Sequence, residues 1–156
     1  MQTLYELDFR RELQEKNLDD VAVLKRNIDR YSEVLEDKKF IDDLVNGILT
    51  RVEELDAFIQ PIAPDWPLDQ IARIDRTILR MGVYELIHGT DVPSKVIINE
   101  AVELAKAFGA DNSSKFINGV LGTAFKQLEE AQSKIIKSTP KKAPSKSSKS
   151  KKDTKK

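Results

Sequence analysis

Apolar residues recur every three or four positions along nearly all of the first 137 residues of this 156-residue chain. One stretch shows the spacing best, through Ile41, Leu44, Val45, Ile48, Val52, Leu55 and Ile59. Few stretches alternate apolar and polar residues, as a half-buried strand would. The pattern is typical of amphipathic helices that face a common core. It predicts an all-α fold, and the chain is long enough for one domain with a core of its own.

Proline, glycine and capping residues predict where the helices begin and end. We expect helices over 1–15, 20–36, 39–60, 68–89, 94–108 and from about 113 to 137. The prolines of "PIAPDWP" forbid a continuous helix between the third and the fourth. Four sites would set the other boundaries: Pro67 in a first turn, Gly89 as a stop, Gly109 as a left-handed cap, and Asp111, Asn112 or Ser113 as an N-cap.

Composition excludes several classes of site. The chain has no cysteine and a single histidine, His88, so disulfides and thiolate metal sites are excluded and a histidine-based zinc site is not expected. No apolar run approaches the roughly 18–20 residues that cross a bilayer, and no secretory signal precedes the first helix. We therefore expect a cytoplasmic protein without metal or cofactor.

Charge is distributed unevenly, although it sums to zero. Residues 1–70 have 9 basic and 17 acidic side chains, whereas residues 138–156 have 8 lysines and one aspartate. This last segment, "STPKKAPSKSSKSKKDTKK", has no large apolar residue, so we expect a disordered tail after a domain of residues 1–137. It is either an anion-binding segment or a dispensable solubilising one.

Two glycines lie inside the sixth expected helix, where each costs about 0.5–1 kcal/mol relative to alanine. At 100° per residue, Gly119 and Gly122 fall on the polar side with Lys115, Asn118 and Lys126, opposite the apolar stripe. One interpretation is that another part of the chain crosses closely there. The other is a flat patch that a partner's backbone or a nucleotide approaches, flanked by groups suited to phosphate and base edges.

The fourth and fifth expected helices also present polar side chains at helical spacing. Arg73, Arg76 and Arg80 form one stripe that either grips phosphate or is neutralised locally, with Asp69 as the partner of Arg73. Glu85 falls on the apolar side, where it needs either an internal partner or a protein that binds at that surface. In the fifth helix, Lys106 belongs to a polar side that by itself indicates a solvated face.

One long stretch resembles a known family. The sequence "DRTILRMGVYELIHGTDVPSKVIINEAVELAKAFGADNSSKFINGVLG" is similar to the C-terminal half of the NusB transcription antitermination factors. It has their Tyr-Glu-Leu helix end, Val-Pro-x-Lys-Val loop, Asn-Glu-Ala helix, Phe-Gly and Lys-Phe-Ile-Asn-Gly-Val-Leu. "QTLYELDF" matches the family's first helix. The resemblance extends over roughly residues 1–130 and is tight over 74–122.

The resemblance implies a helical fold of two packed sub-bundles. It also implies binding to the boxA segment of nascent RNA together with a small-subunit ribosomal protein, the tenth in the usual naming. That pair would help RNA polymerase, with other antitermination factors, to elongate through ribosomal RNA operons. A lysine-rich tail could add RNA binding that is independent of sequence and sensitive to salt.

Site residues follow from the same resemblance. The ribosomal-protein surface would include Tyr5, Glu85 and the surface around Gly122, a position at which the family usually has aspartate. The RNA surface would include Lys115 and Asn118, with Arg76, Arg80 and Lys106 added from the polar stripes. The family also has an arginine-rich segment before its first helix, so we expect the natural chain to extend upstream of Met1.

Three other functions compete with an RNA-binding adaptor. A homodimeric helical scaffold with a masked RNA surface is the main alternative, because some family members pair with themselves. An RNA-binding domain of a ribosomal RNA methyltransferase would need a glycine-rich segment for the methyl donor, which this chain lacks. Catalysis is not expected, since pairs such as Glu100 and Glu103 are explained by a solvated helix face.

Overall fold

The computed structural model describes residues 1–63, 65–89 and 91–138. All of the regular elements in these ranges are helical, which confirms the predicted fold class. They are α1 (Gln2–Glu12), α2 (Asp20–Arg30), α3 (Lys38–Leu49), α4 (Val52–Ile59), the 3-10 turn η1 (Gln60–Ile62), α5 (Arg73–His88), α6 (Ser94–Phe108) and α7 (Ser113–Ser138). None of the described helices combines the length and apolar character needed to span a membrane.

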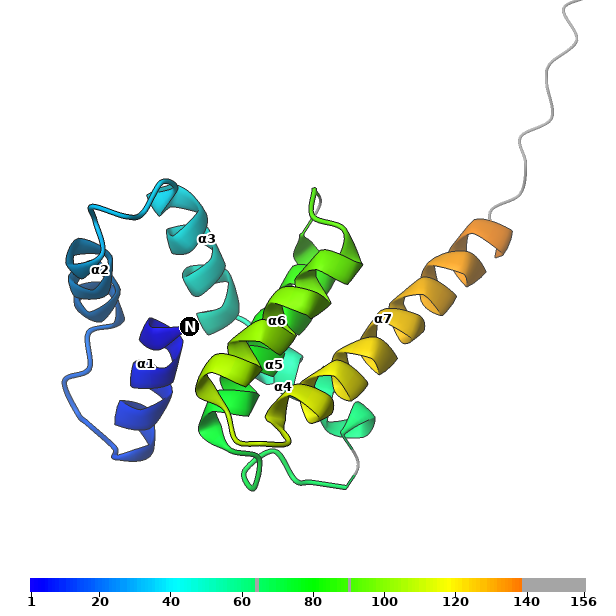
Figure 1. Ribbon diagram of the computed structural model, residues 1–156, viewed down its shortest axis with the longest axis horizontal. Helices are drawn as coiled ribbons and strands as arrows, with labels where there is room; N and C mark the ends of the chain where they lie inside the picture. Colours follow the sequence, from blue (N-terminus) through cyan, green and yellow to red (C-terminus); the bar gives the residue numbers. More distant parts are fainter. Residues whose placement is uncertain (64, 90, 139–156) are drawn as a thin grey trace, which may run out of the picture.

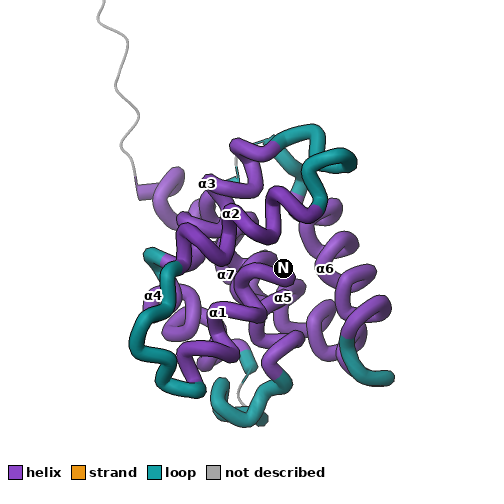
Figure 2. The backbone as a smooth tube through the Cα atoms, turned by 90° about the vertical axis from the view of Figure 1, so that its left-hand side faces the viewer, coloured by secondary structure: helices purple, strands orange, loops and turns teal. Residues whose placement is uncertain are grey.

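The helices form two groups around α5. In Figure 1, α1, α2 and α3 lie on one side, and α4 to α7 lie on the other. Helix α5 touches α1 and α3 of the first group and α4, α6 and α7 of the second, so it belongs to the core of both. Figure 2 shows α1 and α5 close together beneath the α2–α3 pair. The fully buried side chains that hold this arrangement are Leu7, Ile48, Leu55, Ile59, Ile78, Leu79, Val83, Ile117 and Leu121.

The expected third helix is two helices. Helix α3 ends at Leu49 because the Thr50 hydroxyl donates to the carbonyls of Asn46 and Gly47, and the Arg51 guanidinium also donates to Gly47. The Asn46 carbonyl also accepts from the Thr50 N–H, whereas the Arg51 N–H donates to Ile48 and leaves the Gly47 carbonyl to these side chains. Helix α4 then begins at Val52, without a side-chain cap. The apolar spacing continues across the break, which is why the sequence predicted a single helix.

The proline-rich segment also extends further than predicted. Helix α5 begins at Arg73, so Pro67 is not in its first turn. The Gln60 amide holds the preceding loop: its oxygen accepts from the N–H of Leu68, and its NH2 donates to the carbonyl of Trp66. The N–H of Gln70 then donates to the Pro67 carbonyl, which closes a turn rather than a helix.

Two further boundaries differ from the prediction. Helix α2 ends at Arg30, because the Tyr31 N–H donates to the Ile28 carbonyl in a tighter final turn. Gly109 follows α6 as predicted, but its φ of −90° is not left-handed. A side chain at Gly109 would meet Ser113 Cβ at 2.5 Å, so close packing requires the glycine. Gly89 follows α5 directly, as predicted.

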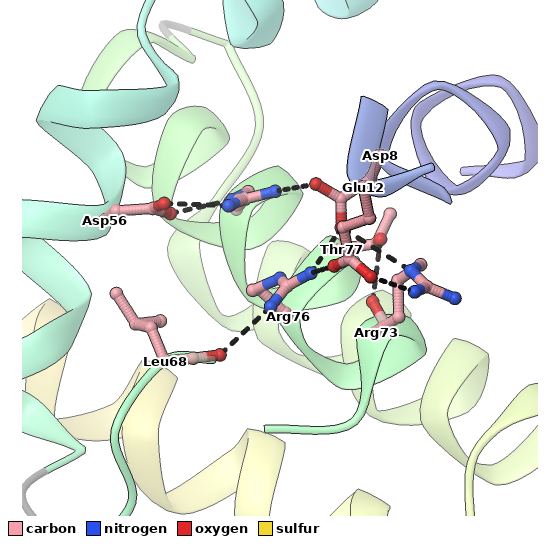
Figure 3. A network of polar contacts seen from close by, with 8 residues as sticks. Asp8, Glu12, Asp56, Leu68, Arg73, Arg76 and Thr77 are labelled. Atoms are coloured by element: carbon pink, nitrogen blue, oxygen red, sulfur yellow. Dashed lines mark hydrogen bonds and ion pairs between the residues drawn. The ribbon is translucent and has the colours of Figure 1, made fainter. Parts of the chain in front are cut away.

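Helix α1 is joined to α5 and α4 by an arginine network, which we define as Asp8, Glu12, Asp56, Arg73, Arg76 and Arg80 (Figure 3). Arg76 Nη2 lies 2.6 Å from both Asp8 Oδ2 and Glu12 Oε1. Arg80 binds both carboxylate oxygens of Asp56 at 2.7 Å and reaches Asp8 at 3.0 Å. Partly buried, bidentate pairs of this kind are stronger than exposed ion pairs.

Candidate nucleic-acid interface

Two of the arginines predicted to contact RNA are engaged inside the protein. Arg76 is only 8% exposed, and Arg80 is half-buried. Burial alone would raise the pKa of Asp8, but hydrogen bonds from Arg76 and Arg80 outweigh it and hold that pKa below its ordinary value. The network leaves these guanidinium groups few free donors for phosphate. The arginines are therefore neutralised within the protein, but the predicted local partner is wrong, because Arg73 pairs with Glu12 of α1 rather than with Asp69.

The beginning of α7 presents the other predicted RNA contacts to solvent. Lys115 and Asn118 are exposed, and they lie within the first two turns of the helix. Gly119 and Gly122 follow on the same side. Among the described residues, no heavy atom outside the adjacent backbone of α7 lies within 4 Å of where a Cβ would stand at either glycine. No described segment therefore crosses closely there, which contradicts the crossing-chain interpretation and leaves the open patch.

A hollow of about 260 Å3 adjoins this end of α7. Trp66 and Phe116 line it with Ile71, and its polar members include Asp75, Asn112 and Ser113. Trp66 is 54% exposed, which is unusual for so large an apolar side chain and makes it available for stacking. Aromatic faces beside exposed basic and amide groups suit an unstacked base.

Asp75 is the unusual group in this hollow, because it is 8% exposed and ion-paired to nothing within the described residues. Its Oδ2 accepts a hydrogen bond from the Ser113 hydroxyl at 2.9 Å, whereas its Oδ1 is buried without a hydrogen-bond partner. Ser113 Oγ also accepts from the Ala110 N–H, so this pair ties the turn before α7 to α5. Burial raises the pKa of Asp75, and the Ser113 bond offsets only part of that effect.

Asp75→Asn is therefore expected to raise the free energy of unfolding at pH 7. A carboxyl whose pKa is raised by folding costs stability once the pH exceeds its unfolded pKa, for which 3.8 is the reference value. The advantage of the variant should shrink towards zero below that pH, where Asp75 is neutral in both states. Urea denaturation at several pH values measures it, with exposed Asp42→Asn on α3 as the control. An equal effect of the two variants would contradict this account.

Sequence reasoning missed Asp75, Trp66 and Phe116 as site residues. Helical spacing, which placed Glu85 on the apolar side of its helix, could also have identified Asp75. Asp75 lies three and four residues before the fully buried Ile78 and Leu79, and therefore on the same side of α5. Trp66 is the only tryptophan of the chain, but its place in the hollow depends on how the loop before α5 folds back.

The predicted protein-partner residues lie on three helices, of which α1 and α5 touch each other. Tyr5 is exposed on α1, where the Arg73 guanidinium lies 5.6 Å from its ring centre. Glu85 is half-buried on α5, and no hydrogen bond or ion pair within the described residues reaches its carboxylate. Burial and then Glu100 raise the pKa of Glu85. Gly122 lies on α7, on the other side of α5 and α6 from α1 in Figure 1.

The remaining predicted features lie elsewhere. Lys106 is exposed on α6 and pairs with Glu103 at 2.6 Å, as expected for a solvated helix face. The predicted tail is outside the described residues from residue 139 onwards. Within those residues, no group of three or more acidic or histidine side chains is arranged to hold a metal ion.

Comparison with known proteins gives one consistent family. The NusB family model matches residues 1–126. The transcription antitermination protein NusB of Dehalococcoides mccartyi (strain ATCC BAA-2266) is 45% identical over 130 residues, which cover 83% of this chain and 87% of that protein. A solved structure of T. maritima NusB is 31% identical with a TM-score of 0.67, and the match covers 84% of this chain and 90% of that chain. A chain in a crystal structure of the antitermination factors NusB and NusE with double-stranded RNA shares the fold at 23% identity. Its TM-score is 0.67, and the match covers 80% of this chain and 89% of that chain.

Proposed function

Because this chain belongs to the NusB family, we propose that it binds boxA-type RNA of ribosomal RNA operons jointly with a small-subunit ribosomal protein. Bound in this way, it supports processive elongation by RNA polymerase as a transcription antitermination factor. The observation that best supports the RNA site is the start of α7, where Lys115 and Asn118 are exposed beside a flat glycine patch and an aromatic hollow. Lysine supplies phosphate affinity, and the amide and aromatic groups supply base contacts.

The ribosomal protein would bind on the α1–α5 side. Glu85 supports this placement, because a half-buried carboxylate is costly when no hydrogen bond or ion pair within the described residues reaches it, and it gains from a cationic group on a partner in addition to the N-terminal ammonium of Met1. On the same pair of helices, the centre of the exposed Tyr5 ring lies 5.6 Å from the guanidinium carbon of Arg73, which is half-buried and paired with Glu12. Aromatic and arginine side chains are enriched where proteins bind one another. Gly122 then belongs with the RNA side rather than with this surface.

Fluorescence anisotropy of a labelled boxA-type RNA tests the proposal, with and without the ribosomal protein and beside a scrambled RNA. We expect a preference for boxA that strengthens with the partner. Lys115→Gln should weaken binding about fivefold through lost phosphate contact, and Asn118→Ala should reduce the preference by about 1–3 kcal/mol if it reads a base edge. Lys39→Gln on α3 removes the same charge far from the site and serves as the control.

Two results would contradict the proposal. One is equal binding of boxA and scrambled RNA in the presence of the partner. The other is RNA binding that weakens as the protein concentration rises while light scattering reports a dimer, because that result describes a self-paired scaffold with a masked RNA surface.

A further inference from the structure

The hollow beside the start of α7 has apolar walls and one polar group that lacks a hydrogen bond. Trp66, Ile71 and Phe116 supply the apolar walls. Asp75 lines the same hollow, and within the described part of the chain its buried Oδ1 has no hydrogen-bond partner. A buried carboxylate oxygen without a donor is costly. A ligand that suits this hollow is therefore flat, largely apolar and equipped with an N–H donor.

The size of the hollow and the residues around it fit one nucleobase. A cavity of roughly 150 Å3 in another protein holds benzene, so about 260 Å3 has room for a single base. The exposed ring of Trp66 and the half-buried ring of Phe116 offer the aromatic faces on which proteins stack unpaired bases. Lys115, exposed next to Phe116 in α7, supplies a cation for the adjoining phosphate.

Asp75 can distinguish one base from another by the edge that each presents. The Ser113 hydroxyl donates to Asp75 Oδ2 at 2.9 Å, so Oδ1 is the acceptor that remains for a ligand. Cytosine has an N4 amino group that donates to a carboxylate, and adenine and guanine also have an exocyclic amino group. Uracil has the carbonyl oxygen O4 where cytosine has the amine, and two acceptors that face each other repel.

We propose that the hollow receives one unpaired base with an exocyclic amino group, and that Asp75 selects this base over uracil by accepting a hydrogen bond from the amine. The inference rests on the proposed function, in which the start of α7 binds RNA, and it adds the class of base that the site takes. A lysine or arginine of a protein partner would also satisfy Asp75. The exposed Lys115 beside the hollow disfavours such a cation and favours a chain of phosphates.

Replacing the amino-bearing bases of the boxA-type RNA by uracil, one at a time, tests the selection. At one position the replacement should weaken binding to the unchanged protein about tenfold or more. Asp75→Asn keeps the size of the side chain and can still accept from Ser113, but it turns an NH2 donor towards the hollow. With this variant, uracil at the same position should bind at least as well as the original base. Asp42→Asn on α3 is the control and should retain the penalty.

Fluorescence of Trp66 reports directly whether the hollow is occupied, because Trp66 is the only tryptophan of the chain. Saturating boxA-type RNA should quench its emission, and saturating RNA with uracil at the selected position should quench it less. Trp66→Ala should weaken the binding of boxA about tenfold through lost stacking, measured by anisotropy. Trp66→Phe keeps an aromatic face, so its affinity should stay within about threefold of that of the unchanged protein.

Three results would overturn the inference. One is that every uracil replacement has the same effect on the unchanged protein and on Asp75→Asn. Another is that bound RNA leaves the emission of Trp66 unchanged. The third is quenching by the ribosomal protein without RNA, which would place a side chain of that partner in the hollow. Failure of the proposed function is distinguishable, because it abolishes the preference for boxA over scrambled RNA, whereas failure of this inference alone leaves that preference intact.

Discussion

Replacing Arg80 by methionine is expected to lower the free energy of unfolding by about 2–4 kcal/mol, because breaking a buried ion pair leaves its partner charges uncompensated. Arg80 binds both oxygens of Asp56 and one of Asp8, and its side chain is only 11% exposed. Methionine keeps much of the stem that packs between α4 and α5. The lost free energy of unfolding therefore measures the contribution of the ion pairs rather than of apolar packing. Urea denaturation followed by circular dichroism measures it.

The loss should depend on pH in a defined direction. The pKa of Asp8 is lowered by folding, so its contribution to stability is present above its unfolded value of 3.8 and is lost as the pH falls through the folded value. The difference between the two proteins should therefore narrow below about pH 4. The control is Lys39→Met, which removes an exposed pair with Asp43 and should leave the free energy of unfolding nearly unchanged. Equal losses for the two variants would contradict a structural role of the network.

Gly82→Ala is expected to lower the free energy of unfolding by about 1–3 kcal/mol through overpacking. The added Cβ would lie 2.7 Å from Cδ1 of Leu121, and Leu121 is fully buried, so little room exists for it to move. Gly119→Ala and Gly122→Ala should instead raise stability by about 0.5–1 kcal/mol each, because alanine favours the helix. Outside the adjacent backbone of α7, no atom of the part of the chain that the structure describes lies within 4 Å of either new methyl group.

The same alanine variants test the open patch on α7. If RNA or a partner backbone approaches Gly119 and Gly122, the two variants should weaken binding while they stabilise the fold. A purely structural role for these glycines predicts the opposite combination, in which binding is unchanged and stability falls. Denaturation and RNA anisotropy on the same protein samples distinguish the two.

Helix content and fold class could be predicted because helical periodicity is local, and each helix shows its buried side within a few turns of sequence. The ends of helices were less predictable. Thr50 ends α3 through bonds to the preceding turn, and Gln60 holds a loop eight residues away at Leu68. Such side chains compete with the backbone for its hydrogen bonds, and the apolar pattern does not register them.

The candidate site likewise contains residues that the sequence predicted and residues that only the structure identified. Lys115 and Asn118 were found from the sequence because they share a polar helix face, and the structure leaves both exposed. Asp75 and Trp66 line the same hollow only because the loop before α5 and the turn before α7 fold against each other. Glu85 was noticed by its place on an apolar face, but whether it had an internal partner depended on the helices packed around it.

By itself, the sequence determined that this chain is helical, that it resembles the NusB family, and that its positive charge gathers at one end. Tertiary structure alone decided what its arginines and glycines do. Arg76 and Arg80 find partners on α1 and α4, at positions 24 to 72 residues away, and no local spacing contains that information. Gly82 is crowded while Gly119 and Gly122 are open, because a glycine's purpose depends on which neighbour crosses the helix there.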